Sequence, residues 1–474
     1  MNHSGSDQKR GLLRQLGLFD STMVMMGIVI GSGIFLTTGI MAKSIPSTGL
    51  ILLAWIVGGL LTLAGSLTFA ELGAAMPEAG GQYVYLREAY GPLFGFLFGW
   101  IVFLVYMTGG IAGLAIAFAE YFGTFFPSLS IQNTIFSASV PVFNGSLSYS
   151  LSMGQIVAVL AILVLTACNY FGLVFGKTIQ NVFTVTKIAI VIVFIALGFT
   201  LGKGTPFDIT FHPQTTNFSY SQLVIGFGVA LIAVSWAFDG WNNVNFVAGE
   251  IRNPRRNLPL ALILGTLSIT VLYILINIIY LYALPMDEIV GVVRIAEKSS
   301  VALFGGTAAN FISIAVLISV FGALNGSILA GPRVYYAMAK DNLFFQKVAE
   351  VHPRYRTPSF AIVIQGVWAC VLALSGTFEQ IITFVIFVSV IFWIAAAASV
   401  FTLRRKYPDL PRPYKTWGYP VVPVLFIIAS VGILLNTLIE KPVESLAGVA
   451  ITLIGVPVYY YWKKRSTENN SDSR

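Results

Sequence analysis

Charge is scarce in this 474-residue sequence, because Asp, Glu, Lys and Arg together make up only 10% of its residues. A soluble domain usually carries about 25% charged residues. Hydrophobic residues make up 56% of the chain, and its mean hydropathy is +0.81. These values exclude an ordinary soluble domain and predict an integral membrane protein with many spans.

Cysteine and histidine are also scarce. The two cysteines, Cys168 and Cys370, both fall within predicted spans, so a structural disulfide is not expected. The three histidines, His3, His212 and His352, fall in tails or loops, and no H-E-x-x-H spacing occurs. We therefore expect no metal, no cofactor and no catalytic residues, which argues against an intramembrane enzyme.

The apolar residues form twelve segments long enough to cross a bilayer, which predicts an all-α membrane protein. Their approximate bounds are 20–43, 49–76, 92–123, 152–174, 179–202, 220–249, 257–284, 305–339, 358–376, 379–403, 419–439 and 443–462. Residues 1–19 are polar and basic without a cleavage pattern, so we expect the first span to be retained. Residues 1–19 and 463–474 are predicted to be cytoplasmic tails.

Basic residues indicate the orientation of the chain. With both termini in the cytoplasm, 22 of the 28 Lys and Arg residues fall on the inner side, 5 on the outer side, and Lys187 within a span. Loops rich in Lys and Arg remain cytoplasmic. The same bias accounts for the net charge of +8, so membrane lipid is an expected partner and nucleic acid is not.

The first span is interrupted near its middle by Gly31-Ser32-Gly33-Ile34-Phe35. Each Gly weakens a helix by about 1 kcal/mol relative to Ala. An unwound turn in hydrocarbon is tolerated only where it is buried in protein or lines a wet cavity. Its freed N–H groups attract an anion and its freed carbonyls attract a cation. The pattern therefore predicts a binding site for a zwitterion such as an amino acid.

A second interruption, at 235–245, places an acid, a glycine and three asparagines inside the apolar run 220–249. Paired interrupted helices at matching places of two repeats predict a transport site at the bilayer midplane. The first repeat would be 20–202 and the second 220–403, and 419–462 would add two further spans.

The side chains of the second interruption also allow other interpretations. Asp239 alternatively forms a structural pair with a neighbouring helix. Trp236 and Phe238 alternatively serve only in helix packing, because aromatic residues at helical spacing are common in protein cores.

Lys187 lies well inside the fifth predicted span. A lysine near the centre of a membrane helix costs about 2.5–3.5 kcal/mol, so such residues are candidates for function. We expect Lys187 to face inward and to donate to freed carbonyls of the first span, where its ammonium would replace a sodium ion. Snorkelling to the cytoplasmic interface is the alternative.

Other segments indicate less by themselves. Residues 71–83, with an acid, a proline and paired glycines, fit either a plain connector or a re-entrant or interfacial loop. Residues 124–151 are predicted to be an external loop, and the small residues of 325–333 favour close helix packing. Ser389 is an isolated hydroxyl in the tenth span.

Three motifs occur together in the chain: Gly31-Ser32-Gly33-Ile34-Phe35; Glu71-Leu72-Gly73 through Pro77 to Gly80-Gly81 and Tyr83; and Asp239-Gly240-Trp241-Asn242 followed by Asn245-Phe246 and Asn253-Pro254. Together they resemble the amino acid, polyamine and organocation superfamily. Most closely, the chain looks like a stand-alone bacterial member of its L-amino-acid transporter family. The resemblance implies twelve transmembrane helices in a five-plus-five inverted repeat, with discontinuous helices 1 and 6 and two extra C-terminal helices.

The resemblance also implies a set of site residues. Carbonyls of Val29 and around Trp236 and Asp239 would hold the substrate ammonium, and N–H groups of Ser32 and Gly33 its carboxylate. Lys187 matches the lysine that takes over a sodium site in this family. The full set expected to bind substrate is Val29, Gly31, Ser32, Gly33, Trp236, Ala237, Phe238, Asp239, Asn242 and Ser389.

Three of these positions depart from the family pattern. Trp236 stands at a gate position that is usually Phe, and Ser389 stands where Asn is frequent. Asp239 replaces a Gly, Ala or Ser of several members. Animal members join a single-span partner through a cysteine between spans 3 and 4. Residues 124–151 contain none, so no covalent heavy subunit is expected.

The sequence therefore favours a sodium-independent transporter that exchanges neutral L-amino acids across the bacterial inner membrane by alternating access. Proton-coupled uptake, with Lys187 or Asp239 titrating, is the alternative. A channel would need a polar lining along several helices, whereas only Lys187 and Asp239 lie deep, so a single occluded site is favoured.

Overall fold

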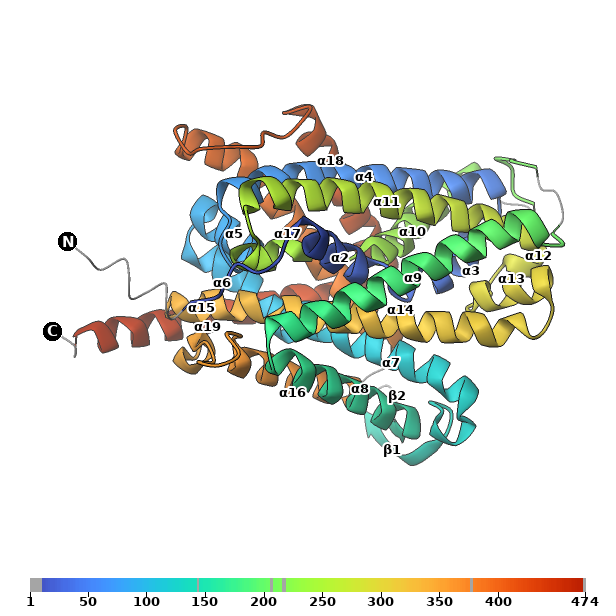
Figure 1. Ribbon diagram of the computed structural model, residues 1–474, viewed down its shortest axis with the longest axis horizontal. Helices are drawn as coiled ribbons and strands as arrows, with labels where there is room; N and C mark the ends of the chain where they lie inside the picture. The colour runs from blue at the N-terminus through green and yellow to red at the C-terminus, as the bar shows by residue number, and fades with distance from the viewer. Residues whose placement is uncertain (1–10, 143–144, 205–207, 215–218, 376–377, 472–474) are drawn as a thin grey trace.

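The computed structural model describes residues 11–142, 145–204, 208–214, 219–375 and 378–471, and it confirms the expected all-α membrane architecture. Long helices run roughly side by side along the longest axis of the molecule (Figure 1). Within the described residues, eleven helices are long and apolar enough to span a membrane, and a shorter apolar helix, α16 (Ser359–Ser375), occupies the place of the ninth predicted span.

The first half of the chain contains these elements: α2 (Leu18–Val29), α3 (Gly33–Ser44), α4 (Thr48–Ala75), α5 (Gln82–Tyr90), α6 (Pro92–Ile101), the π-helical η1 (Val102–Tyr106), α7 (Met107–Phe125), the 3-10 turn η2 (Pro127–Leu129), β1 (Thr134–Val142), β2 (Gly145–Ser152), α8 (Met153–Tyr170) and α9 (Leu173–Leu201). The second half contains α10 (Tyr220–Phe238), the 3-10 helix η3 (Asn243–Glu250), α11 (Pro254–Ala283), α12 (Met286–Ile289), α13 (Ile295–Phe304), α14 (Ala308–Ala330), α15 (Pro332–Lys340), η4 (Gln346–Ala349), α16, α17 (Phe378–Lys406), α18 (Val421–Glu440) and α19 (Pro442–Ser471). The second half is the longer one, because α18 and α19 follow α17 at its end.

Both predicted interruptions are present. The first span divides into α2 and α3 on either side of residues 30–32, and the sixth divides into α10 and η3 on either side of residues 239–242. The second half of the sixth span is a 3-10 helix, which the sequence did not indicate. This 3-10 helix has eight residues, and a 3-10 stretch within a helix often marks a functional hinge or a sequence under strain.

Several connections differ from the sequence expectation. Residues 71–83 end α4, turn, and lead into the mostly buried helix α5. The predicted external loop 124–151 contains an antiparallel hairpin of β1 and β2. Its serines alternate with apolar residues, and this period of two favours a strand over a helix. The fifth span begins at Leu173, earlier than predicted, directly after Gly172 with φ +134°.

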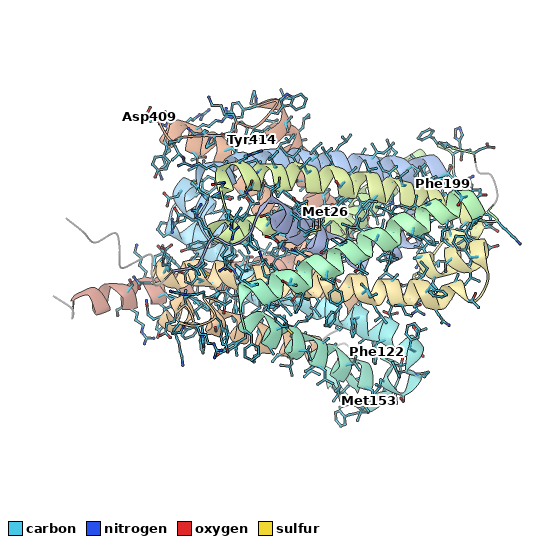
Figure 2. All side chains as sticks on the ribbon, in the orientation of Figure 1. Met26, Phe122, Met153, Phe199, Asp409 and Tyr414 are labelled. Carbon is cyan, nitrogen blue, oxygen red and sulfur yellow. The ribbon has the colours of Figure 1, made fainter. Side chains whose placement is uncertain are left out.

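The broken first span is the centre of the bundle. α2 packs against α9, α11 and α14, and α3 packs against α10. Met26 of α2 lies in the middle of the molecule, whereas Asp409 and Tyr414 lie on the separate loop between α17 and α18 (Figure 2). In the most apolar 18-residue stretch of the first span, 94% of the residues are buried in protein. The corresponding shares are 28% for α18 and 22% for α19. The last two spans therefore lie on the outside of the bundle, and the first is enclosed by protein.

Candidate functional site

The break in the first span leaves peptide groups without helical partners. The Ile30 N–H still donates to the Met26 carbonyl at 2.9 Å, and the Gly31 N–H donates to the Val29 carbonyl at 2.8 Å. At the start of α3 the Phe35 N–H donates to the Ser32 carbonyl at 3.1 Å, and the N–H groups before it have no intrahelical acceptor because they open the helix. Ser32 occupies the N-cap position of α3 without making a side-chain capping bond, and its hydroxyl is buried without a partner in the described part of the chain. This end of α3 therefore presents donors suited to an anion.

The second break is a turn that only glycine fits. Gly240 has φ +90°, and a Cβ there would lie 2.3 Å from Cγ2 of Ile28. The Asp239 N–H donates to the Trp236 carbonyl at 3.1 Å and ends α10. Because L side chains rarely adopt this φ, the Asp-Gly pair both stops the helix and lets the turn approach α2 closely.

The two breaks are in direct contact. A Cβ on Gly33 would lie 2.6 Å from the Cα of Ala237, closer than real Cβ atoms come. The hydroxyl of Tyr273 on α11 lies 3.0 Å from the Val29 carbonyl and 3.1 Å from the Ala237 carbonyl. The rings of Trp55 and Phe238 pack on the Tyr273 ring, with centroids 5.4 and 5.1 Å away. Tyr273 thus tethers the ends of α2 and α10.

Lys187 of α9 makes the expected contact with the first break. Its Nζ donates to the carbonyls of Gly27 and Ile30 at 2.7 Å each, and to that of Ser319 on α14 at 2.9 Å. The Ser319 hydroxyl also donates to Ile30, at 2.9 Å. Since Lys187 is only 1% exposed, the snorkelling alternative is wrong. The ammonium satisfies carbonyls that would otherwise attract a metal cation, although its role in coupling stays a prediction.

A small cavity of about 40 Å³ lies between the two breaks. A water needs about 10–15 Å³ by this measure, so the cavity has room for a few waters. Its lining residues are Ile28, Val29, Gly31, Ser32, Gly33, Tyr106, Met107, Gly110, Leu114, Trp236, Asp239, Asn243 and Ser327. An amino acid in this cavity would need small dimensions or a movement of the wall.

Asp239 is the acidic group of the cavity wall. Its Oδ1 accepts a hydrogen bond from the Tyr106 hydroxyl at 3.2 Å, and that hydroxyl also lies 3.1 Å from Oδ1 of Asn243. Among the described residues, Asp239 forms no ion pair with Lys, Arg or His. Because Tyr106 lies on a different helix, the structure contains the structural pairing given as the alternative for Asp239, as a hydrogen bond and not as an ion pair. Substrate binding by Asp239 stays a prediction.

Six of the ten residues expected to bind substrate line this cavity, namely Val29, Gly31, Ser32, Gly33, Trp236 and Asp239. The other four lie outside the lining. The Phe238 ring packs against Trp55 and Tyr273, so the alternative interpretation, in which Phe238 serves in helix packing, fits this residue. Asn242 donates to Oε1 of Gln82 at 2.5 Å, and the Ser389 hydroxyl donates to the Ile386 carbonyl of its own helix at 2.9 Å. Ala237 contributes its carbonyl to Tyr273.

Sequence reasoning missed residues that reach the site from uninterrupted helices. Tyr106, Tyr273 and Ser319 each hold a group of one of the two breaks. A lone tyrosine or serine in an apolar helix gives no sequence signal of its own. Tyr106 ends the π-helical η1, a geometry that often marks functional positions, but periodicity cannot reveal it. The described residues contain no group of His, Cys, Asp or Glu able to hold a metal ion.

Comparison with known proteins gives one family and a set of full-length relatives. A family model described as "Amino acid permease" matches residues 16–459. The serine/threonine exchanger SteT of Bacillus subtilis (strain 168) is 34% identical over 461 residues, which cover 97% of this chain and 99% of the relative. The human b(0,+)-type amino acid transporter 1 is 30% identical over 460 residues, covering 95% of this chain and 88% of the relative. The human large neutral amino acids transporter small subunit 2 is 29% identical over 463 residues, covering 96% and 82%.

Proposed function

The chain belongs to the amino acid permease family, and from this premise we propose that it exchanges small neutral L-amino acids across the plasma membrane. The observation that carries the proposal is the juxtaposition of the two helix breaks around a small cavity. Ser32 and Gly33 at the start of α3 line that cavity, as do Val29 at the end of α2 and Trp236 and Asp239 at the end of α10. This arrangement complements a carboxylate and an ammonium on one carbon.

The substrate ammonium would bind carbonyls that retain acceptor capacity. Each carbonyl has two lone pairs, so the Val29 oxygen can accept from Tyr273 and from a ligand together. The carboxylate would bind the N–H groups of Ser32 and Gly33 and the unpartnered Ser32 hydroxyl. The cavity of about 40 Å³ favours small side chains, in keeping with a relative that is named a serine/threonine exchanger.

Sodium independence is proposed from Lys187. A sodium ion would need the carbonyls of Gly27 and Ile30 as ligands, and the buried ammonium already satisfies both. Exchange would follow if bound substrate stabilises the occluded state through tighter contacts and so lowers the barrier between the two facing states. Proton-coupled uptake remains the rival, because Asp239 lines the cavity without a basic partner among the described residues.

Orientation and assembly belong to the same proposal. We place both termini in the cytoplasm of a bacterial inner membrane, from the bias of basic residues. One relative is named a small subunit. This chain has no cysteine between residues 124 and 151, so it would act without a covalently attached partner.

The test is transport into proteoliposomes preloaded with unlabelled amino acid. Labelled serine, threonine, alanine, leucine and lysine would be compared with and without internal substrate, with sodium replaced by choline, and with an imposed pH gradient. We expect internal serine to accelerate uptake at least about tenfold, with no effect of choline. Uptake driven by a pH gradient into empty vesicles would instead establish the rival.

A further inference from the structure

The last helix ends in a cluster of aromatic and basic residues. α19 runs from Pro442 to Ser471, its apolar run ends at about residue 462, and only 22% of its most apolar window is buried in protein. Trp462, Lys463, Lys464 and Arg465 therefore stand where the apolar span stops. Tryptophan and basic residues at this depth face the lipid headgroups.

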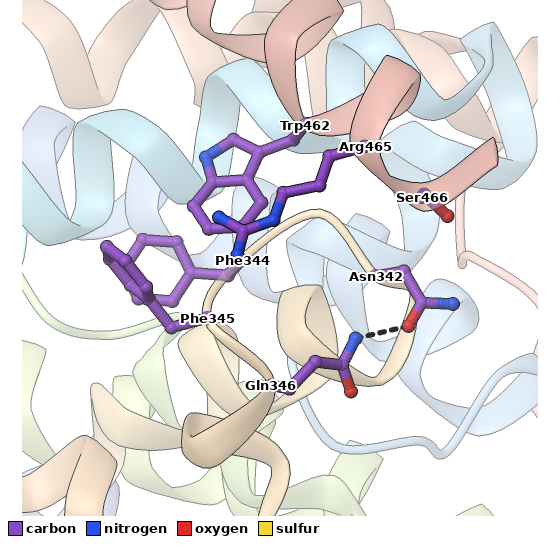
Figure 3. Close-up of a pocket in the computed structure, with 7 residues that line it drawn as sticks. All are labelled: Asn342, Phe344, Phe345, Gln346, Trp462, Arg465 and Ser466. Atoms are coloured by element: carbon purple, nitrogen blue, oxygen red, sulfur yellow. Dashed lines mark hydrogen bonds between the residues drawn. The ribbon is translucent and has the colours of Figure 1, made fainter. Parts of the chain in front are cut away.

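Beside this cluster lies a pocket of about 150 Å³ between α19 and the turn that joins α15 to η4 (Figure 3). One wall is aromatic. Phe344 is buried, whereas Phe345 is 55% exposed and packs edge-on against the Trp462 ring, with centroids 5.0 Å apart. An exposed phenylalanine is costly in water and favourable against hydrocarbon, so the rings mark the side that faces lipid.

The remaining wall is polar and positively charged. The Arg465 guanidinium lies 5.9 Å from the Trp462 ring centroid. Asn342 and Gln346 are hydrogen-bonded to each other, and Ser466 adds a hydroxyl (Figure 3). None of the lining residues is acidic. A group that fits here carries negative charge, accepts several hydrogen bonds and continues into an apolar part.

We propose that this pocket binds the headgroup of an anionic phospholipid. Arg465 contacts the phosphate, the amides of Asn342 and Gln346 and the Ser466 hydroxyl contact the remaining headgroup oxygens, and an acyl chain runs along Phe345 and Trp462. Basic pockets between spans on the cytoplasmic side suit such headgroups. Free phosphate would leave the exposed aromatic wall uncovered, so the lipid is the better occupant.

The position of the pocket gives lipid binding a structural consequence. Asn342 directly follows Asp341, which accepts hydrogen bonds from the Tyr83 hydroxyl at 2.7 Å and from Arg87 at 2.5 Å. Both donors belong to α5. A lipid held between α19 and residue 342 therefore braces the lipid-facing last helix against the α15–α5 contact.

The experiment measures retention of phosphatidylglycerol by the purified full-length protein in titrations against phosphatidylcholine. Arg465→Gln removes the pocket cation. Lys463→Gln is the matched control, because it removes an exposed charge that lies outside the lining and 6.0 Å from the Tyr459 ring centroid. One basic residue near an anionic surface contributes about fivefold in lipid affinity. We expect Lys463→Gln to stay within that factor and Arg465→Gln to weaken retention more than about tenfold. Equal losses in both variants would overturn the pocket and leave only general surface attraction.

Two further measurements locate the lipid. Phosphatidylglycerol with brominated acyl chains should quench a fluorescence component that Trp462→Phe removes, and quenching unchanged by that substitution would contradict the proposed site. Millimolar inorganic phosphate should not displace the lipid, and full displacement would overturn the lipid assignment in favour of a free anion. Neither readout depends on amino acid transport, so failure here is distinguishable from failure of the proposed exchange.

Discussion

The two helix breaks lie against each other but offer different chemical groups. The first, at residues 30–32, offers mainly peptide groups, and the lysine that completes it comes from another helix. The second, at residues 239–242, brings side chains, with Asp239 and the neighbouring Asn243 facing Tyr106. Backbone groups suit the carboxylate and ammonium that all amino acids share. Side chains at the second break suit the part of the substrate that differs between amino acids.

The largest expected effect comes from Lys187→Ala, which removes the lysine that binds carbonyls of the first break. It removes three charge-assisted hydrogen bonds to buried carbonyls, and each such bond contributes about 1.5–3 kcal/mol. We expect exchange in proteoliposomes to fall at least about 100-fold while membrane insertion is retained. Lys203→Ala, at an exposed lysine just beyond the same helix, is the control and should transport normally. Normal exchange by Lys187→Ala would remove the proposed role of this residue.

Gly33→Ala tests whether the close approach of the breaks shapes the site. The new Cβ would meet the Ala237 backbone at 2.6 Å, and overpacking of this kind costs about 1–3 kcal/mol. The apparent KM for serine should therefore rise about 5- to 150-fold. Gly110 also lines the cavity but has open space around its Cβ position, so Gly110→Ala should change KM much less. Equal KM values for the two variants would place the carboxylate site elsewhere.

Tyr273→Phe measures how much the hydroxyl that tethers the two breaks contributes to kcat/KM for exchange. It removes the hydroxyl shared by the Val29 and Ala237 carbonyls and leaves the ring packing intact. One hydrogen bond contributes about 0.5–1.5 kcal/mol, so kcat/KM should fall about 2- to 12-fold. Tyr280→Phe on the same helix is the matched control, since that buried hydroxyl has no partner among the described residues. A larger loss from Tyr280→Phe would contradict the tether.

How far the sequence predicts this site depends on the kind of signal each residue leaves. Gly31, Gly33, Gly240 and Asp239 are predictable because glycine and charge are out of place in an apolar helix. Lys187 is predictable for the same reason, and the twelve spans follow from apolar length.

Other parts of the site and fold leave no such signal. Tyr273 and Tyr106 look like packing residues until the helices are placed, because their function depends on one hydroxyl and a rotation about the helix axis. The 3-10 form of η3 and the orientation of Phe238 away from the cavity depend on neighbouring helices. Local sequence preference cannot determine either of them.

The smallest effect on neutral substrates is expected from Asp239→Asn. This substitution distinguishes two roles for the second break, side-chain selection and energy coupling. The substitution keeps the shape and the acceptor for the Tyr106 hydroxyl but removes the charge. Exchange of serine should change less than about threefold, since the backbone groups of the first break hold the shared part of the substrate. Inhibition by lysine should weaken about tenfold, because a buried cation would lose its only acidic neighbour in the cavity lining. If Asp239 instead carries a coupling proton, the variant would lose concentrative uptake driven by a pH gradient while retaining exchange, and the second break would then serve energy coupling in place of side-chain selection.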